Sequence, residues 1–154
     1  MGWSVSDMLE LGHRHADLEA RRELVPLMAT LVENPCYEFH PLGLGMSGGD
    51  RVRRYYQQFF DDFMQKIVGY ELLDEWASES SVAQEYAITL KLGPEGVGGG
   101  AEDSEGELET HRVLGILFAQ QTASGTLLGG ERIYAGERVI RLMAGTLFDE
   151  FEPL

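Results

Sequence analysis

Two periodicities of apolar residues divide the chain, a helical one in the first half and a strand-like one in the second. Between residues 52 and 67 apolar side chains recur at steps of three and four, starting with Val52, Tyr55 and Phe59. This spacing predicts an amphipathic helix that Asp50 is placed to cap. We expect its wide aromatic face to pack against a sheet.

The N-terminal segment also predicts helix. Ser4 and Asp7 have the S-x-x-D form of a capping box, and the chain from there to Val32 is rich in Leu, Ala, Glu and Arg. Pro26 cannot donate the backbone hydrogen bond of an interior helical residue. We therefore expect two helices, or one kinked helix, ended by Pro35.

A short strand and a loop are expected between the helical segments. Residues 36–40 are of strand type, and Pro41 closes the strand because the residue before a proline is disfavoured in the α region. The glycine-spaced stretch that follows predicts a loop as far as Gly49.

Strand-like alternation begins at Val68 and continues through most of the second half. Four segments show it, at residues 68–76, 82–92, 110–121 and 127–134. Short turn-like links at 78–81 and 122–125 predict sequential antiparallel pairing. A last amphipathic helical turn or two is expected at 137–143, before an acidic tail.

The stretch of about residues 93–108 interrupts the strands with glycines and acids and contains no basic residue. Few apolar groups there could offset the entropy lost on ordering the backbone. We predict a mobile loop.

Helices first, then a short strand, a helix and a meander of long strands form an α+β order with helices on one face of the sheet. The length of 154 residues suits one ordinary domain. We therefore predict a single α+β domain over 1–154. Its curved, mainly antiparallel sheet, backed by about three helices, would enclose an apolar pocket.

Charge and cysteine content narrow the function classes. Twenty-six acidic and twelve basic residues leave a formal charge of −14, which disfavours nucleic acid and anionic membranes as partners. Neither a membrane-spanning run nor a signal-peptide pattern is visible, so we expect a cytoplasmic location. Cys36 is the only cysteine, which excludes an intramolecular disulfide, and we expect it to be buried.

Four segments resemble the SnoaL-like branch of the nuclear transport factor 2-like superfamily, close to its ketosteroid isomerases. They lie at residues 34–43, 49–60, 111–113 and 130–134, and the resemblance covers roughly residues 16–145. It implies a cone-shaped half-barrel with a deep pocket, commonly in a homodimer. The superfamily hosts isomerases, cyclases, epoxide hydrolases, dehydratases and non-catalytic scaffolds, so the fold alone does not name a reaction.

The His-Pro-Leu-Gly motif that begins at His40 is similar to the Asp-Pro-Val-Gly motif of ketosteroid isomerases, whose aspartate moves the substrate proton. A histidine, with an unperturbed pKa near ~6.5, can also serve as a base. His111 resembles the histidine on a long middle strand of the cyclase branch. The isomerase tyrosine of the first helix is absent, since Ala16 and Leu18 stand near its place. The late-strand acid of the isomerases and the Arg-Asp pair of limonene epoxide hydrolases are not identified.

A small acid/base site is the sharper hypothesis for the strand residues. It uses His40 or His111 as the base and Glu85 or Glu131 as the orienting carboxylate or general acid, because an apolar cone raises a carboxyl pKa. The strand register is open across the turn at 122–125, so either Glu131 or Arg132 could face the pocket. The alternative is that these residues face solvent or form satisfied histidine–carboxylate pairs.

Aromatic residues are the candidates for substrate contact, namely Tyr37, Tyr55, Tyr56, Phe59, Trp76, Tyr86 and Tyr134. His13 and His15 lie on a polar helical segment and are expected at the surface. The histidine spacing favours no metal site, and motifs for dinucleotides, phosphates or a serine nucleophile are missing, so we predict no cofactor.

Two functions remain open from the sequence. One is a cofactor-free isomerase, cyclase or dehydratase that transfers protons on a small hydrophobic molecule. The other is a non-catalytic ligand-binding or dimerisation module whose cone is filled by Trp76, Tyr86 and Phe118. An open pocket lined by two interacting titratable groups would favour the enzyme.

Overall fold

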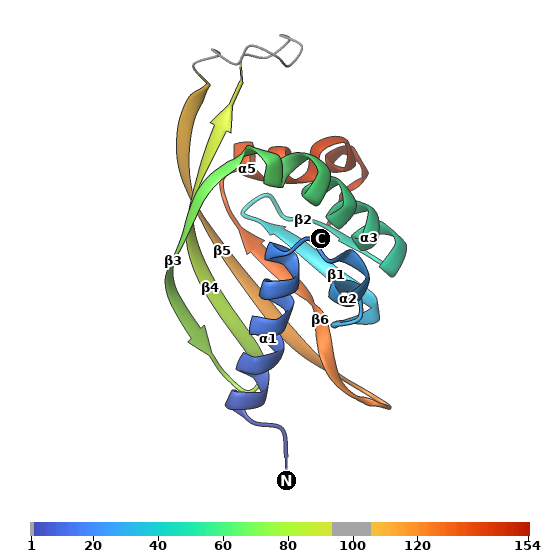
Figure 1. Cartoon of the computed structure of the whole chain (residues 1–154). Helices are drawn as coiled ribbons and strands as arrows, with labels where there is room; N and C mark the ends of the chain where they lie inside the picture. Colours follow the sequence, from blue (N-terminus) through green and yellow to red (C-terminus); the bar gives the residue numbers. More distant parts are fainter. Residues whose placement is uncertain (1, 94–105) are drawn as a thin grey trace.

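The computed structural model describes residues 2–93 and 106–154, which form a strongly curved, unclosed seven-stranded sheet with helices on its concave face (Figure 1). This arrangement confirms the predicted α+β class and the mainly antiparallel sheet. The predicted mobile loop falls largely on residues 94–105, outside the described residues.

Two helices open the chain, α1 at Val5–Ala20 and α2 at Leu24–Met28. The capping box predicted at Ser4 is present, with reciprocal hydrogen bonds between Ser4 and Asp7. The chain turns between the helices at Arg22, whose φ is 57°. Pro26 lies in the first turn of α2, where backbone N–H groups lack helical partners in any case. The expected division into two helices is confirmed.

Strand β1, at Leu31–His40, begins five residues before the strand expected from the sequence. The expectation that Pro35 would end a helix was wrong, because the strand is irregular between Leu31 and Cys36 and a proline is tolerated there. Strand β2, at Leu44–Ser47, replaces part of the expected loop and pairs antiparallel with β1. Cys36, expected to be buried, is only partly buried.

The aromatic helix forms as α3 at Gly49–Gln58, continues as a π-helical turn at Phe59–Phe63 and ends as α4 at Met64–Lys66. Gly48, rather than Asp50, is the N-cap residue. Asp50 lies in the first turn, where its charge still complements the helix dipole. The inward face is buried as predicted and consists of Val52, Tyr55, Tyr56, Phe59, Phe60 and Phe63.

The four long strands pair in sequence, as predicted, with β3 at Ile67–Ala77, β4 at Ser81–Leu92, β5 at Glu107–Thr122 and β6 at Gly125–Tyr134. Strand β6 then pairs in parallel with β1, so the sheet order is β3-β4-β5-β6-β1-β2-β7. The short β7, at Glu152–Pro153, comes from the acidic tail.

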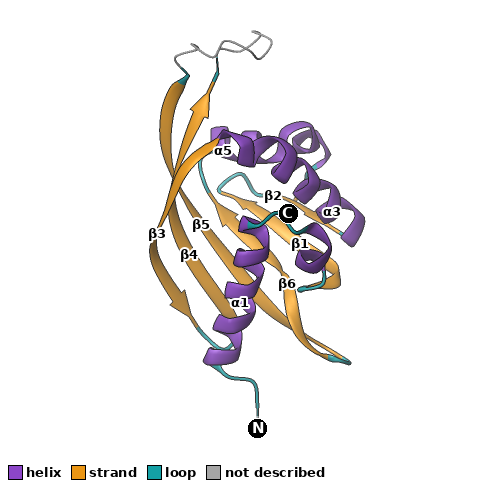
Figure 2. Cartoon of the chain, viewed as in Figure 1, coloured by secondary structure: helices purple, strands orange, loops and turns teal. Residues whose placement is uncertain are grey.

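Helix α5 at Glu137–Ala144 and a 3-10 turn at Gly145–Glu150 complete the helical layer, close to the helix predicted at 137–143. Figure 2 shows this layer on one side of the sheet, while the other side of β3, β4 and β5 stays uncovered. Among the described residues, no helix combines the length and apolar character that a membrane span requires.

A bulge in β6 sets which of its side chains face the helices. Up to the pair Ala119–Leu128 the β5–β6 ladder is regular, but the next pair is Phe118–Gly130, so Gly129 is an extra residue. Beyond the bulge Glu131 lies opposite Leu117, on the concave side. Without it, Glu131 would pair with residue 116 and face outward.

Candidate functional site

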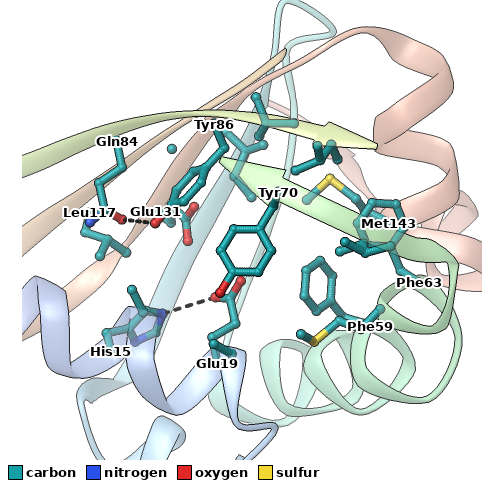
Figure 3. Close-up of a pocket in the computed structure, with 18 residues that line it drawn as sticks. His15, Glu19, Phe59, Phe63, Tyr70, Gln84, Tyr86, Leu117, Glu131 and Met143 are labelled. Atoms are coloured by element: carbon teal, nitrogen blue, oxygen red, sulfur yellow. Dashed lines mark hydrogen bonds and ion pairs between the residues drawn. The ribbon is translucent and has the colours of Figure 1, made fainter. Parts of the chain in front are cut away.

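A cavity of about 190 Å³ lies between the helical layer and the concave face of the sheet (Figure 3). Helix α1 contributes His15 and Glu19, and the π-helical turn contributes Phe59 and Phe63. Strands β3 to β6 supply the opposite wall, and Tyr70 of β3 stands at its exposed rim.

Three titratable groups converge in this cavity. Nitrogen or oxygen atoms of His15, Glu19 and Glu131 all lie within 4.8 Å of one another. His15 and Glu19 sit one turn apart on α1, and Glu131 reaches them from β6 across the cavity (Figure 3). Two carboxyl groups and an imidazole thus face one another in a mainly apolar space.

The tautomer of His15 follows from its neighbours. Thr30 Oγ1 donates its single proton to the carbonyl oxygen of Leu27, at 2.7 Å. The contact between His15 Nδ1 and Thr30 Oγ1, also 2.7 Å, must therefore be donated by Nδ1. Burial lowers the pKa of His15 to about 3, so the ring is neutral and Nε2 offers a lone pair.

A hydrogen-bonded chain of hydroxyls reaches this lone pair. Tyr56 Oη lies 3.2 Å from His15 Nε2 and 2.6 Å from Tyr37 Oη, and Tyr56 also hydrogen-bonds Glu19. Tyr56 has one proton to give, either to Nε2 or to the Glu19 carboxylate. In both cases Tyr37 donates to Tyr56, so the hydroxyls of the two tyrosines are hydrogen-bonded to each other inside the core.

Burial raises the pKa of both carboxyl groups, and the charge of Glu19 raises that of Glu131 further. The pKa of Glu19 rises to about 7, mainly through burial, while the hydrogen bond from Tyr56 limits the rise. The pKa of Glu131 is raised well above its ordinary value by burial and by the nearby Glu19 charge. Near neutral pH the pair can therefore hold one proton between its members, as a matched acid and base.

The environment separates the roles of the two carboxyls. The Tyr56 hydroxyl supports the ionised form of Glu19. Among the described residues, no side chain hydrogen-bonds the Glu131 carboxyl, whose oxygens remain accessible to the cavity. Gly115 gives that carboxyl room, since a Cβ there would lie 2.5 Å from Glu131 Oε1. Glu131 is thus the group most available to a ligand.

The same three groups are close enough together to surround a metal ion. However, the Tyr56 hydroxyl already occupies the side of the His15 ring on which Nε2 could bind a metal. The absence of a cofactor remains a prediction.

Three of the residues proposed from the sequence line the cavity, namely Glu131, Phe59 and Tyr86. The sequence left open whether Glu131 or Arg132 faces the cavity. The bulge turns Glu131 toward it and Arg132 to the outer face. Tyr37, Tyr55 and Tyr56 are buried behind the cavity wall and do not line it.

His40 lies outside the cavity, on the outer face of the sheet. Its Nε2 contacts Glu38 at 2.9 Å, and its ring stacks on Tyr134 with 4.8 Å between the centroids. Glu38 also pairs with Arg132 at 3.5 Å. This cluster matches the alternative of a satisfied histidine–carboxylate pair, and it separates His40 and Tyr134 from the pocket chemistry.

His111 shares the concave face but lies farther along β5, outside the cavity lining. It contacts Glu109 at 2.9 Å, and Arg138 of α5 binds the same carboxylate through two hydrogen bonds. Glu85 faces outward and its carboxylate lies 3.8 Å from Arg112.

Trp76 also lies outside the cavity. Its side chain is on the outer face of β3 and is 52% exposed. Phe118, expected as a possible filler of the cone, lies on the outer face under the Arg132 guanidinium. Of the three aromatics expected to fill the cone, only Tyr86 borders it, so the space stays open.

The assignment of His15 to the surface was wrong, since the residue is 1% exposed, whereas His13 is exposed as expected. Glu19 was missed altogether. A signal was present, because Met8, Gly12, His15 and Glu19 follow helical spacing on one face of α1. The polar character of the segment concealed that face.

No protein-family model and no curated protein matches the sequence. Solved structures do match, with identities too low to show more than a shared fold.

Three such structures illustrate the match. The epoxide hydrolase/cyclase-like enzyme SalBIII, with a role in pyran ring formation in the polyether salinomycin, has a TM-score of 0.62 at 15% identity over 86% of this chain and 93% of that chain. An NTF2-like protein from Anabaena variabilis ATCC 29413 has a TM-score of 0.57 at 15% identity, covering 84% and 90%. A ketosteroid isomerase-like protein from Erwinia carotovora atroseptica SCRI1043 has a TM-score of 0.53 at 12% identity, covering 85% and 95%.

These matches agree with the layer order, the curved meander and the resemblance found in the sequence. The chain has the nuclear transport factor 2-like fold of the ketosteroid isomerase-like and cyclase-like proteins.

Proposed function

We propose that the chain is a cofactor-free enzyme that binds a small molecule in the cavity and moves protons with Glu19 and Glu131, as an isomerase or a cyclase. One observation carries the proposal. Two carboxyl groups and a neutral imidazole lie within 4.8 Å of one another in a cavity that side chains leave open. This is the arrangement that favours an enzyme over a filled scaffold.

The carboxyl pair can act as base and acid in one step. Glu19, supported by Tyr56, is the carboxylate that removes a proton from a carbon or a hydroxyl of the substrate. Glu131 is the carboxylic acid that gives its proton to the developing oxyanion, either an enolate or an opening epoxide. The pair then carries the same total number of protons as before, with the positions exchanged, so a second transfer or exchange with solvent restores it.

The cavity limits the size of the substrate. An engineered cavity of about 150 Å³ binds benzene. The volume of 190 Å³ therefore suits a molecule of one substituted ring, with longer substituents passing Tyr70 at the rim.

The relatives in structure support this class of reaction. SalBIII is an epoxide hydrolase/cyclase-like enzyme, and another match is ketosteroid isomerase-like. The shared fold alone would not favour a reaction, so the proposal depends on the carboxyl pair.

Turnover by single-site variants tests the proposal. One-ring unsaturated ketones and hydroxy-epoxides, with and without an amino substituent, would be incubated with the protein in D2O and followed by NMR for deuterium uptake or ring closure. For any substrate found, Glu131→Gln and Glu19→Gln should each lower the rate by about 10²–10⁴, because an amide cannot exchange the proton.

Matched controls come from the charged residues outside the cavity. His40→Ala, His111→Ala and Glu85→Gln should leave turnover within about threefold of the parent, since surface changes away from the site have small effects. A turnover that survives Glu131→Gln but disappears with His40→Ala or His111→Ala would overturn the proposal in favour of the histidines.

A further inference from the structure

Apart from the neutral His15, the ionisable groups that line the cavity are all acids. These acids are the carboxyls of Glu19 and Glu131 and the tyrosines Tyr70 and Tyr86. Among the described residues, no lysine or arginine lines this cavity. The ionised pair therefore has no cation of the protein within the cavity, and an anionic ligand would meet repulsion there.

His15 cannot supply the missing positive charge. Its Nδ1 proton is committed to Thr30, and its Nε2 faces the Tyr56 hydroxyl. Burial also keeps the ring neutral, since it lowers the pKa of His15 to about 3. The charge that balances the two carboxylates must come from a ligand or from a proton.

The spacing of the carboxyls suits a shared ammonium group. Oxygens of Glu19 and Glu131 approach within 4.8 Å of each other, and a charge-assisted N–H···O bond is about 2.7–2.9 Å long. One nitrogen placed between the two oxygens can therefore donate to both.

The walls suit the rest of such a ligand. Phe59, Phe63, Tyr70 and Tyr86 surround the carboxyls with aromatic surface, which attracts cations through the ring faces and accepts an apolar body. The net charge of −14 would also steer a cation toward the protein.

We propose that the ligand of this cavity is a small organic ammonium ion, with an apolar body the size of one ring and a protonated amine held between Glu19 and Glu131. The inference rests on the proposed function only in that the cavity binds a small molecule. In the complex the ammonium group takes the place of the shared proton. Both carboxylates are then ionised, so Glu19 keeps its role as the base, and the proton for the oxyanion comes from the ammonium group instead of from Glu131.

Three ring-matched probes test the charge of the ligand. Benzylamine, benzyl alcohol and benzoate would be titrated into the full chain and followed by protein-observed NMR. We expect benzylamine to bind about tenfold or more tightly than benzyl alcohol, as a charge-assisted hydrogen bond would produce. Benzoate should not displace either probe.

Two variants connect the preference to the carboxyls. Glu131→Gln should reduce the preference for benzylamine to about threefold or less, while Glu85→Gln, with a carboxylate on the outer face, should keep it. Folding of each variant is checked by thermal melting. Retention of the full preference in folded Glu131→Gln would place the amine elsewhere and overturn the inference.

The outcomes separate this inference from the proposed function. Equal or tighter binding of benzyl alcohol would overturn the cationic ligand and leave a neutral small-molecule pocket. Absence of binding by all three probes would count against both. Loss of turnover in Glu131→Gln, without a preference for the amine, would support the enzyme alone.

Discussion

His15 Nδ1 donates a 2.7 Å hydrogen bond to Thr30 Oγ1, and this bond fixes the state of the ring that faces the carboxyl pair. Thr30 directly precedes β1, and its hydroxyl donates a hydrogen bond to the carbonyl oxygen of Leu27 near the end of α2. The local fold that ends α2 thus presents Nε2, rather than an N–H group, to Tyr56 and Glu19.

We predict that His15 is neutral, with the proton on Nδ1, throughout pH 5–8. Its pKa is lowered to about 3 because burial disfavours the charged ring. Nitrogen-15 correlation spectra of the imidazoles distinguish the two tautomers and the charged form. Exposed His13 gives a second imidazole signal in the same spectra for comparison.

Thr30→Val and Thr30→Ser form a matched pair for this bond. The valine variant removes the acceptor of a buried N–H and should destabilise the fold by about 1–3 kcal/mol. The serine variant keeps the hydroxyl and should lose less. The assignment fails if Thr30→Val leaves the Nδ1 tautomer and the melting temperature unchanged.

We predict that the carboxyl pair lowers the free energy of unfolding above pH 5. Because the pKa of Glu131 is raised in the folded state, the folded protein binds more protons than the unfolded chain as pH rises past the ordinary value of 4.5. Stability from this source is present at low pH and is lost as pH increases. Glu131→Gln removes the charge and should stabilise the protein at pH 8 by on the order of 1–2 kcal/mol, or about 2–8 °C in Tm.

The same comparison at pH 4.5 should show little difference between Glu131→Gln and the parent, because the carboxyl is then protonated in the fold. His15 destabilises the protein as pH falls from 6.5 toward 3, but equally in both chains. Glu85→Gln should change Tm by less than about 2 °C at either pH. A parent more stable than Glu131→Gln at pH 8 would contradict the prediction.

The elements with strong periodicity were predictable from the sequence, and the site was only partly so. The aromatic stripe from Val52 and the alternation from Val68 each follow one period over many residues, so tertiary contacts did not need to be known. The predicted strand began too late, at residue 36, because Pro35 was expected to end the preceding helix. The irregularity in β1 that accommodates this proline could not be foreseen from the sequence.

The orientation of Glu131 depended on information that periodicity does not carry. A single extra residue, Gly129, exchanges the two faces of β6, and glycine is compatible with bulges and with many other conformations. His15 was misplaced for a related reason. Its partners Thr30 and Tyr56 come from distant parts of the chain. Their hydrogen bonds satisfy the polar atoms of the imidazole, which allows the ring to be buried.

Gly130 should tolerate no side chain. Its φ is 145°, and an added Cβ would lie 1.8 Å from the carbonyl oxygen of Cys36 on β1. We predict that Gly130→Ala loses more than ~4 kcal/mol of stability or fails to fold, measured by chemical denaturation. Gly125→Ala is the control in the same strand, with φ of 135° but open space around the Cβ. It should cost only about 1–3 kcal/mol, and a similar loss for both variants would mean that the contact with β1 does not matter.

Gly115 offers a way to move the acid without removing it. A Cβ at this position would lie 2.5 Å from Glu131 Oε1, the end of a flexible side chain, so the carboxyl rather than the backbone should shift. We predict that Gly115→Ala keeps its Tm within about 4 °C of the parent. Turnover should fall by about 10²-fold, because acid catalysis depends on placing the proton donor within hydrogen-bond reach.

Gly69→Ala, on β3 with open space around its Cβ, is the matched control and should keep full turnover. The carbon-13 shift of the Glu131 carboxyl reports the displacement directly. An unchanged shift together with lost turnover would indicate that Gly115 acts on the substrate itself and not through Glu131.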